Sequence, residues 1–438
     1  MSAIPQQLLS LPKVKGLKGI DNRVHRIYPT NASGATEFTY NGLSRIIFSI
    51  PAYKNGFFNP MRSFLHFQAK TGSNRTYFNA GLPIINRMVI RTGNGQLIED
   101  IQDYSLIQRV LTNFEDESKI RGRANITGDH RSDLPPMDLA DLANSHFQGR
   151  TFSHDLLSGV LGKGQEHYIP VGLFNATGGF SFEIELHIED PIVACSALAD
   201  DAGNVTNSLS YSLSDVSLQM EIVTLPSTVT DRLNSELQSE SKVSIPFSTY
   251  RLHQAHFPVN SQSVDVNISE SAHDLETVYT CMVKQNYALT KAGYGIDNYF
   301  LNGGTNSTNQ LKAYQWRYDT KYYPDSKSEM ASNDSKLALY NAIHTLDIAD
   351  KPTFASMKNF WDQAGFCCIV QSFKSSRDNF LNSLNSSSTG APLELQIQLR
   401  SPATEAMKIQ SFVKSNYTLN IVKGGLTTVL NGTVTSTN

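Results

Sequence analysis

Two stretches of the chain, 211 residues apart (394 − 183), carry the same alternation of apolar and polar residues. Residues 183–189 read EIELHIE and residues 394–400 read ELQIQLR, and a proline follows each two residues later. Alternation with a period of two is typical of a strand with one buried and one exposed face. A second alternating run follows each stretch, over 216–222 and 417–422. A repeated strand pair at nearly half of 438 residues predicts two similar β-domains in tandem.

The rest of the chain has many short strand patterns bounded by turn residues and few helical ones. Strands are expected at 37–40, 45–50, 64–69, 84–92, 96–101, 242–247, 263–268, 278–283 and 366–373. Helical spacing of apolar residues predicts helices at 103–117, 336–346 and 356–363. This distribution predicts an all-β protein with two tandem jelly-roll β-sandwich barrels, short helices and long loop inserts.

The domain boundaries follow from changes in composition. We predict a basic N-terminal arm over 1–34, a first jelly roll over 35–230 and a second over 231–438. The polar segment 231–240 is the expected connection between the two barrels. The second barrel contains a long insert, 286–335, with seven tyrosines. Loops of this length are usually functional or disordered, and the aromatic content argues against simple disorder.

The net charge of −3 argues against a dedicated nucleic-acid binder, but the charge is unevenly distributed. Residues 1–26 hold five cations and one acid, Asp21, which gives a local charge of +4. A basic arm before an acidic body favours contact with a polyanion or an anionic surface. The candidate arm contacts are Lys13, Lys15, Lys18, Arg23 and Arg26.

Catalytic and metal-binding motifs are not found in the sequence, so we predict no enzyme activity, no cofactor and no metal. Glu183 and Glu185 lie on one strand face about 7 Å apart, a spacing that glycosidase carboxylates can have. The ordinary exposed face of a sandwich explains the pair better. His253 and His256 lack a nearby carboxylate or cysteine that would complete a metal site. The four cysteines are expected to be buried, reduced thiols.

The aromatic insert is the second candidate site. Its aromatic side chains could form an outer loop or a subunit interface, since Tyr and Trp are enriched at interfaces. They could also stack on the apolar face of a sugar. The candidate residues are Tyr314, Trp316, Tyr318, Tyr322 and Tyr323.

A family resemblance is carried by the order of four segments in the first half. These are LLSG at 156–159, YIPVG at 168–172, FEIEL at 182–186 and YSLSDVSLQMEIV at 211–223. Together they resemble the late strands of the first barrel in double jelly-roll major capsid proteins, particularly those of virophages and polinton-like viruses. Weaker similarity covers 35–101 and 388–422.

The resemblance implies a structural protein that forms trimeric, pseudo-hexameric capsomers of an icosahedral double-stranded DNA virus. Its implied partners are further copies of itself, neighbouring capsomers, penton proteins and minor capsid proteins. The basic arm would contact genomic DNA or an internal membrane, and no small-molecule substrate is implied. The expected location is the virion shell, assembled inside the infected host cell.

Two other protein classes remain open from the residues alone. The first is a tandem β-sandwich that binds or hydrolyses glycans, for which Trp316 would be the stacking residue. The second is a viral tail or spike protein, which shares the β-rich composition. The strand repeat argues against the spike, because spikes usually have one elongated repeat type.

Overall fold

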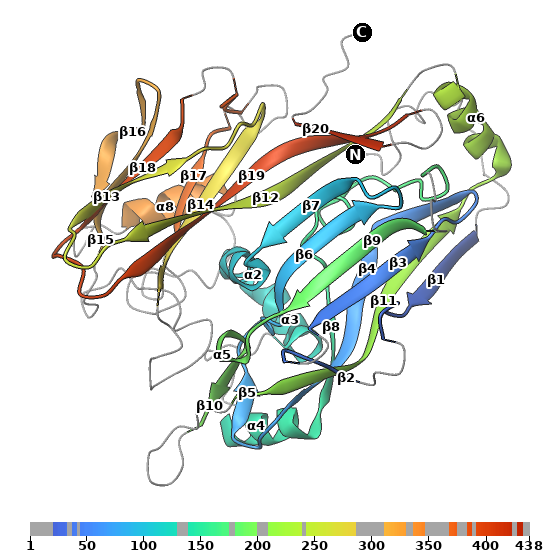
Figure 1. Cartoon of the computed structure of the whole chain (residues 1–438), viewed down its shortest axis with the longest axis horizontal. Helices are drawn as coiled ribbons and strands as arrows, with labels where there is room; N and C mark the ends of the chain where they lie inside the picture. Colours follow the sequence, from blue (N-terminus) through green and yellow to red (C-terminus); the bar gives the residue numbers. More distant parts are fainter. Residues whose placement is uncertain are drawn as a thin grey trace.

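The computed structural model describes residues 21–32, 37–41, 44–128, 139–174, 180–198, 209–238, 242–285, 311–329, 336–346, 368–374, 383–387, 391–422 and 427–431. Most of these residues lie in antiparallel sheets, which form two groups along the chain (Figure 1). Every strand pairing joins two strands of the same half, before or after helix α6 (Ser227–Gln238).

The first half contains two large sheets. Sheet I has the order β1-β11-β4-β8, and the short strand β2 also pairs with β11. Its strands are β1 (Asp21–Ile27), β2 (Glu37–Thr39), β4 (Gly56–Thr71), β8 (Arg150–His154) and β11 (Tyr211–Thr224). Sheet II has the order β3-β9-β6-β7. Its strands are β3 (Arg45–Pro51), β6 (Ile85–Thr92), β7 (Leu97–Gln102) and β9 (Phe180–Ile188). A separate pair joins β5 (Thr76–Phe78) and β10 (Cys195–Ala197).

The second half has the same plan. Sheet III has the order β12-β19-β14-β17, and β20 also pairs with β19. Its strands are β12 (Val243–Phe257), β14 (Leu275–Lys284), β17 (Ile369–Ser372), β19 (Met407–Ile421) and β20 (Thr427–Asn431). Sheet IV has the order β13-β18-β15-β16. Its strands are β13 (Ser263–Ile268), β15 (Leu311–Tyr318), β16 (Lys321–Glu329) and β18 (Leu393–Leu399).

The chain alternates between its two sheets in the same way in both halves. Leaving aside the short strands β2, β5, β10 and β20, the first half follows the order I, II, I, II, II, I, II, I. The second half follows III, IV, III, IV, IV, III, IV, III. Eight strands distributed in this way over two packed sheets form a jelly roll. The predicted all-β double jelly roll is therefore confirmed.

The repeated motif of the sequence occupies matching strands. Residues 183–188 lie in β9 and residues 394–399 in β18, and both strands are second in their sheets. Ile184 pairs with Ile90 in β6, and Leu395 pairs with Trp316 in β15. Ile90 and Trp316 therefore hold equivalent places, and both are fully buried.

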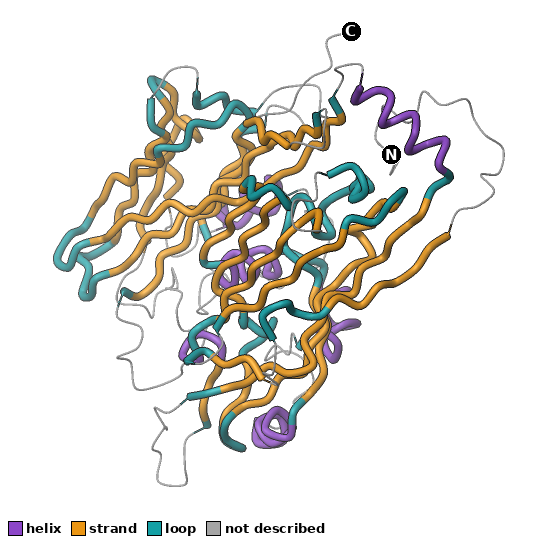
Figure 2. Tube along the Cα trace, turned by 45° about the vertical axis from the view of Figure 1, so that its right-hand side comes forward, coloured by secondary structure: helices purple, strands orange, loops and turns teal. Residues whose placement is uncertain are grey.

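The two ends of each barrel differ. At one end, here called the arm end, β1 begins, β11 ends, and the turns between β3 and β4 and between β6 and β7 are short. The opposite end, the loop end, carries most of the helices and short strands of the first half. These are α2 (Tyr104–Asn113), α3 (Glu117–Thr127), α4 (Leu139–Gln148), α5 (Pro191–Ala194), β5 and β10. Strands of both halves run in roughly the same direction, so the loop ends point the same way (Figure 2).

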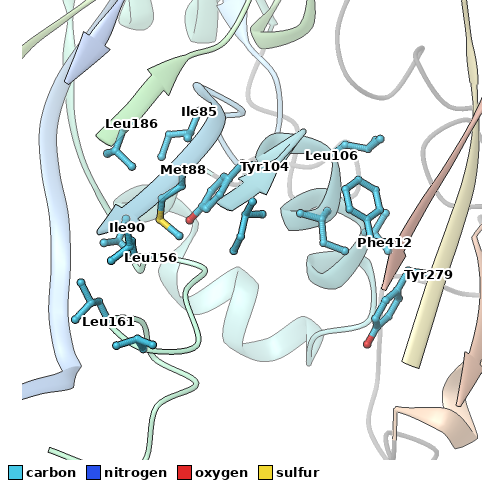
Figure 3. Packing of buried hydrophobic residues seen from close by; sticks show 14 of the residues in the cluster. Ile85, Met88, Ile90, Tyr104, Leu106, Leu156, Leu161, Leu186, Tyr279 and Phe412 are labelled. Atoms are coloured by element: carbon cyan, nitrogen blue, oxygen red, sulfur yellow. The ribbon is translucent and has the colours of Figure 1, made fainter. Parts of the chain in front are cut away.

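The hydrophobic core continues from one half into the other. Helix α2 presents apolar residues at helical spacing, as the sequence predicts, and lies between sheet II and sheet III. Figure 3 shows Tyr104 beside Met88 of the first half and Leu106 facing Phe412 and Tyr279 of the second. All five side chains are buried. The two barrels therefore share one packed interior at this point.

Three expectations about the chain are corrected. Residues 21–27 of the predicted arm form β1, because Val24 and its neighbours complete the edge of sheet I beside β11. Residues 311–329 of the predicted insert form the hairpin β15–β16, because their alternating pattern continues sheet IV. The helix expected at 103–117 ends at Asn113, and residues 117–127 form a second helix, α3, whose first turn is capped by Asp116. Helix α8 (Lys336–Thr345) matches the prediction, whereas 356–363 lies outside the described residues.

Candidate assembly surfaces

The junction between the barrels is built where β7, the edge of sheet II, meets β12, the edge of sheet III. Glu99 of β7 lies there with 1% of its surface exposed. Its carboxylate accepts hydrogen bonds from Ser158 Oγ, from Gly159 N at 2.9 Å and from Val160 N at 3.3 Å. Strand β12 also brings the Thr249 side chain close to this carboxylate. Burial raises the pKa of Glu99, and these hydrogen bonds oppose the rise.

The loop held by Glu99 packs directly on the backbone of β12. A Cβ atom at Gly159 would lie 1.9 Å from the carbonyl oxygen of Ser248, so only glycine fits this approach. Six residues further on, Gln165 Nε2 donates to the carbonyl of Pro246 at 3.1 Å. The first barrel thus contacts the main chain of the second, which fixes their relative position.

A third contact lies at the other end of β7. Asp103 precedes helix α2, and its Oδ2 accepts from Gln254 Nε2 at 3.3 Å and from Gln410 Nε2. Both glutamines belong to sheet III. Burial raises the pKa of Asp103, while Lys408 and the two amides oppose the rise. The junction therefore combines hydrogen bonds with the apolar contacts of α2.

Each of the two junction strands has an equivalent strand in the other barrel. In the described chain, neither equivalent strand packs against the edge of another barrel. By its place in the sheet order, β16 corresponds to β7, and β1 corresponds to β12. Glu99 pairs with Ile90, and Tyr323 pairs with Trp316, so Tyr323 of β16 matches Glu99. Glu99 contacts the loop after β8, and Tyr323 contacts the equivalent loop after β17. The centroid of the Tyr323 ring lies 5.4 Å from that of Phe373 in that loop.

These two edges lie at opposite ends of the molecule and expose apolar side chains. Figure 1 shows β16 at the upper left and β1 on the right. Val24 of β1 is 64% exposed and Tyr322 of β16 is 41% exposed. An unpaired strand edge with exposed apolar residues is a ready contact surface for another chain.

The predicted arm cations fall into two groups. Lys13, Lys15 and Lys18 lie outside the described residues. Arg23 and Arg26 lie on β1, where Arg23 pairs with Asp21 at 2.6 Å and Arg26 with Asp215 at 2.8 Å. These two arginines belong to the barrel wall and not to an arm. Their part in inner-surface contacts stays a prediction.

The aromatic candidates of the insert are divided by the hairpin. Tyr314, Trp316 and Tyr318 are buried, because β15 lies between β18 and β16 and turns these rings into the core. Their assignment to an outer loop is therefore wrong. Tyr322 and Tyr323 reach the surface on the edge strand β16. The alternation LKAYQWRY over 311–318 was the signal that could have identified the strand.

One of the two predicted glutamates of β9, Glu185, is a buried ion-pair partner. Glu185 is 8% exposed and accepts from Arg45 at 3.1 Å and Arg91 at 3.2 Å. His187 Nε2 lies 3.0 Å from the same carboxylate. Burial would raise the pKa of Glu185, but the arginines outweigh it and hold the pKa below its ordinary value. A glycosidase acid needs the opposite shift, so Glu185 does not supply one.

The remaining candidates serve structural roles where they are described. His253 lies in β12 with Nε2 3.0 Å from Glu270. Within the described ranges, no group of three or more His, Cys, Asp or Glu could hold a metal ion. Cys195, Cys281 and Cys368 are buried free thiols, and Cys367 falls outside those ranges. None of the described helices is long and apolar enough to cross a membrane.

Comparison with known proteins gives structural matches only. No family model and no curated protein matches the sequence. The PBCV-1 virus capsid model matches with a TM-score of 0.63 at 10% identity, over 97% of this chain and 100% of that one. The Faustovirus major capsid protein matches with a TM-score of 0.57 at 10% identity, over 92% and 91%. The Sputnik virophage structure matches with a TM-score of 0.56 at 10% identity, over 97% and 91%. The chain thus has, over almost its whole length, the double jelly-roll fold of viral major capsid proteins.

Proposed function

We propose that this protein is a structural major capsid protein and that three copies form a pseudo-hexameric capsomer. The observation that carries the proposal is the repeated barrel, whose internal junction uses one edge of each barrel and leaves the matching edges without a partner strand among the described residues. The fold shared with viral major capsid proteins supports the same reading. No described site offers a competing chemistry.

The free edges suggest how the copies associate. Strand β16 of one copy would contact β1 of the next, as β7 contacts β12 within the chain. Such a contact joins different surfaces, so it either closes into a ring or continues as an open helix. If each barrel-to-barrel step turns by the same angle, three two-barrel chains close a ring of six barrels. A ring with a six-sided outline can occupy a six-sided position in the lattice of an icosahedral shell.

The position of the chain start supports an orientation of the capsomer. The described chain begins at the arm end with β1, directly after the cationic segment that contains Lys13, Lys15 and Lys18. The arm end would face the interior of a double-stranded DNA virus, where the cations meet genomic DNA or an internal membrane. Minor capsid proteins would also contact this side, and penton proteins would contact the outermost capsomers. The protein would then reside in the virion shell.

A measurement of mass in solution tests the trimer. The purified chain should have three times the mass of its 48.5 kDa monomer in light scattering. Val24→Asp on β1 and Tyr322→Asp on β16 should each shift the trimer toward monomer, because each places a charge on a contacting edge. Val259→Asp is the matched control, since Val259 is 47% exposed in the turn between β12 and β13.

Two results would argue against the trimer and its contact. A stable monomer at micromolar concentration would contradict the capsomer. A trimer that tolerates both edge variants as well as it tolerates Val259→Asp would contradict the β16–β1 contact.

Removal of the arm tests its separate role. Because β1 begins at Asp21, the deletion should end at residue 20 and not at 26, where it would remove a barrel strand. The variant should still form trimers but assemble fewer shells. Shell yield equal to that of the full chain would show that the arm is not an assembly clamp.

Glycan hydrolysis or binding through the insert is the alternative function, and its residues do not support it. Trp316 has no exposed surface with which to stack on a sugar. Glu185 of β9 is held ionised by two arginines.

A further inference from the structure

A groove of about 430 Å³ lies at the loop end of the first barrel, and none of the junction residues named above lines it. It runs over the start of β11, between β2 on one side and the end of β4 on the other. Helix α4 contributes Phe147 and helix α5 contributes Pro191 to its walls. Its size falls within the range of pockets that hold small molecules.

The floor of the groove is a row of polar side chains in register across three strands. Ser212 of β11 pairs with Lys70 of β4 and with Thr39 of β2, so the three side chains share one face. None of the three forms a hydrogen bond or ion pair with other residues in the part of the chain that the structure describes. Asn41, at the turn after β2, is exposed and also lines the groove.

Aromatic rings flank this row. Tyr40 is 39% exposed and Phe147 is 38% exposed. Burial and the nearby carboxylate of Asp190 raise the pKa of the Tyr40 hydroxyl. Lys70 Nζ lies 5.7 Å from the Phe147 ring centroid. Two partly exposed rings beside unpaired polar groups give a surface that is apolar at its walls and polar at its floor.

We propose that this groove binds a neutral pyranose ring of a glycan. The C–H faces of a sugar ring pack on aromatic side chains, and its hydroxyls need both donors and acceptors. Lys70 supplies a donor, whereas Ser212, Thr39 and Asn41 supply both. A purely apolar ligand would leave the floor unpaired. The carboxylate of Glu37, which also lines the groove, disfavours an anionic ligand.

The site adds a binding activity to the proposed structural function. If the arm end faces the shell interior, the loop end and its groove face outward, where surface glycans of a host cell are reached. The binding itself does not depend on assembly. A monomeric protein that binds sugar would refute the capsomer but keep the groove, and a trimer that does not bind would do the reverse.

A titration of the full chain with simple sugars, followed by saturation-transfer NMR, tests whether the groove binds them. The probes are the methyl glycosides of glucose, galactose, mannose and N-acetylglucosamine, with N-acetylneuraminic acid as the acidic comparison. At least one neutral glycoside should bind saturably. Tyr40→Ala and Phe147→Ala should each weaken it about tenfold or more, because each removes one stacking face.

Two further variants separate binding from folding. Ser212→Ala removes one floor hydroxyl without changing the walls and should weaken binding severalfold. Tyr340→Ala is the matched control, because Tyr340 on α8 is 59% exposed and lies in the second half. It should bind as the unaltered protein does. All variants should retain the same circular dichroism and the same mass.

Several outcomes would overturn the proposal. The first is that no neutral glycoside binds saturably, and the second is that only N-acetylneuraminic acid binds. The third is that Tyr40→Ala and Phe147→Ala bind the sugar as tightly as the unaltered protein does. A change of mass in these two variants would instead assign the groove to a contact between copies of the chain.

Discussion

The two barrels share their strand order but treat their buried carboxylates in opposite ways. In the first barrel, burial raises the pKa of Glu99 and brings that of Glu189 to about 7. In the second, burial acts in the same direction, but nearby cations and hydrogen bonds hold the pKa of Glu270 and of Glu276 below the ordinary value. Glu185 is the exception in the first barrel, since two arginines reach it. A repeated topology therefore repeats the position of strands and not the chemistry of their side chains.

Matching core positions make the same point. Ile90 and Trp316 occupy equivalent places, and both are fully buried, yet their volumes differ greatly. The side chains that surround the two positions must therefore differ, since protein interiors are close-packed. In the second barrel Phe373 meets the Trp316 ring edge-on, with centroids 6.2 Å apart.

The largest effect should come from removing the larger of these two side chains. Trp316→Ala should reduce the free energy of unfolding by about 4 kcal/mol, because it leaves a large cavity in the second barrel. Ile90→Ala should cost about 3 kcal/mol in the first. Urea denaturation of both variants measures the difference. A loss below about 1 kcal/mol for Trp316→Ala would contradict its place in the core.

The junction should be sensitive to one methyl group. Gly159→Ala should destabilise the protein by about 3 kcal/mol, because the new Cβ would overlap the Ser248 carbonyl oxygen. Gly164→Ala, in the same loop, is the control, since a Cβ there meets nothing within 4 Å. Thermal denaturation should show a lower Tm for the first variant only. Equal Tm values would mean that the barrels do not pack through this loop.

The opposite pKa shifts predict opposite pH effects in the two barrels. The pKa of Glu189 rises on folding from an ordinary value of 4.5 to about 7. Between these values the folded chain keeps a proton that the unfolded chain has lost, so stability falls as pH rises. The full loss is about 3 kcal/mol above pH 7. Glu189→Gln cannot ionise and should remove this slope in denaturation measured from pH 4 to pH 8. A slope unchanged by the substitution would contradict the shift.

A smaller effect of the opposite sign is expected for Glu276. Lys374 and Lys414 lie 2.7 and 2.8 Å from its Oε1, and the folded pKa lies below the unfolded one. Its contribution is therefore present above the unfolded pKa and is lost as pH falls through the folded pKa. Glu276→Gln should cost about 2 kcal/mol at pH 7, allowing for the partial exposure of both lysines.

The control for this ion pair is an exposed one. Glu117→Gln removes the partner of Arg121 on the surface of α3 and should change stability by less than about 0.5 kcal/mol. Similar losses for Glu276→Gln and Glu117→Gln in urea denaturation at pH 7 would show that burial does not strengthen the Glu276 cluster.

Strand alternation predicted the fold because a period of two is a local property of the chain. The alternating pattern of 183–189 recurs at 394–400 and predicts two barrels. Most strands lie where apolar and polar residues alternate. The same alternation runs through 311–318, although the many aromatics of the insert favour a loop there. It does not identify β1, in which none of the residues is buried.

The sequence by itself determined the fold class and the duplication. Only the tertiary structure decided which acids are buried, which strand edges remain free and where polar side chains from three strands align into a groove. Asp103 and Gln410 are 307 residues apart, and no local pattern specifies that they meet. Periodicity records how each strand faces its own core. The contacts between barrels depend on how whole sheets pack, which is a property of the assembled chain.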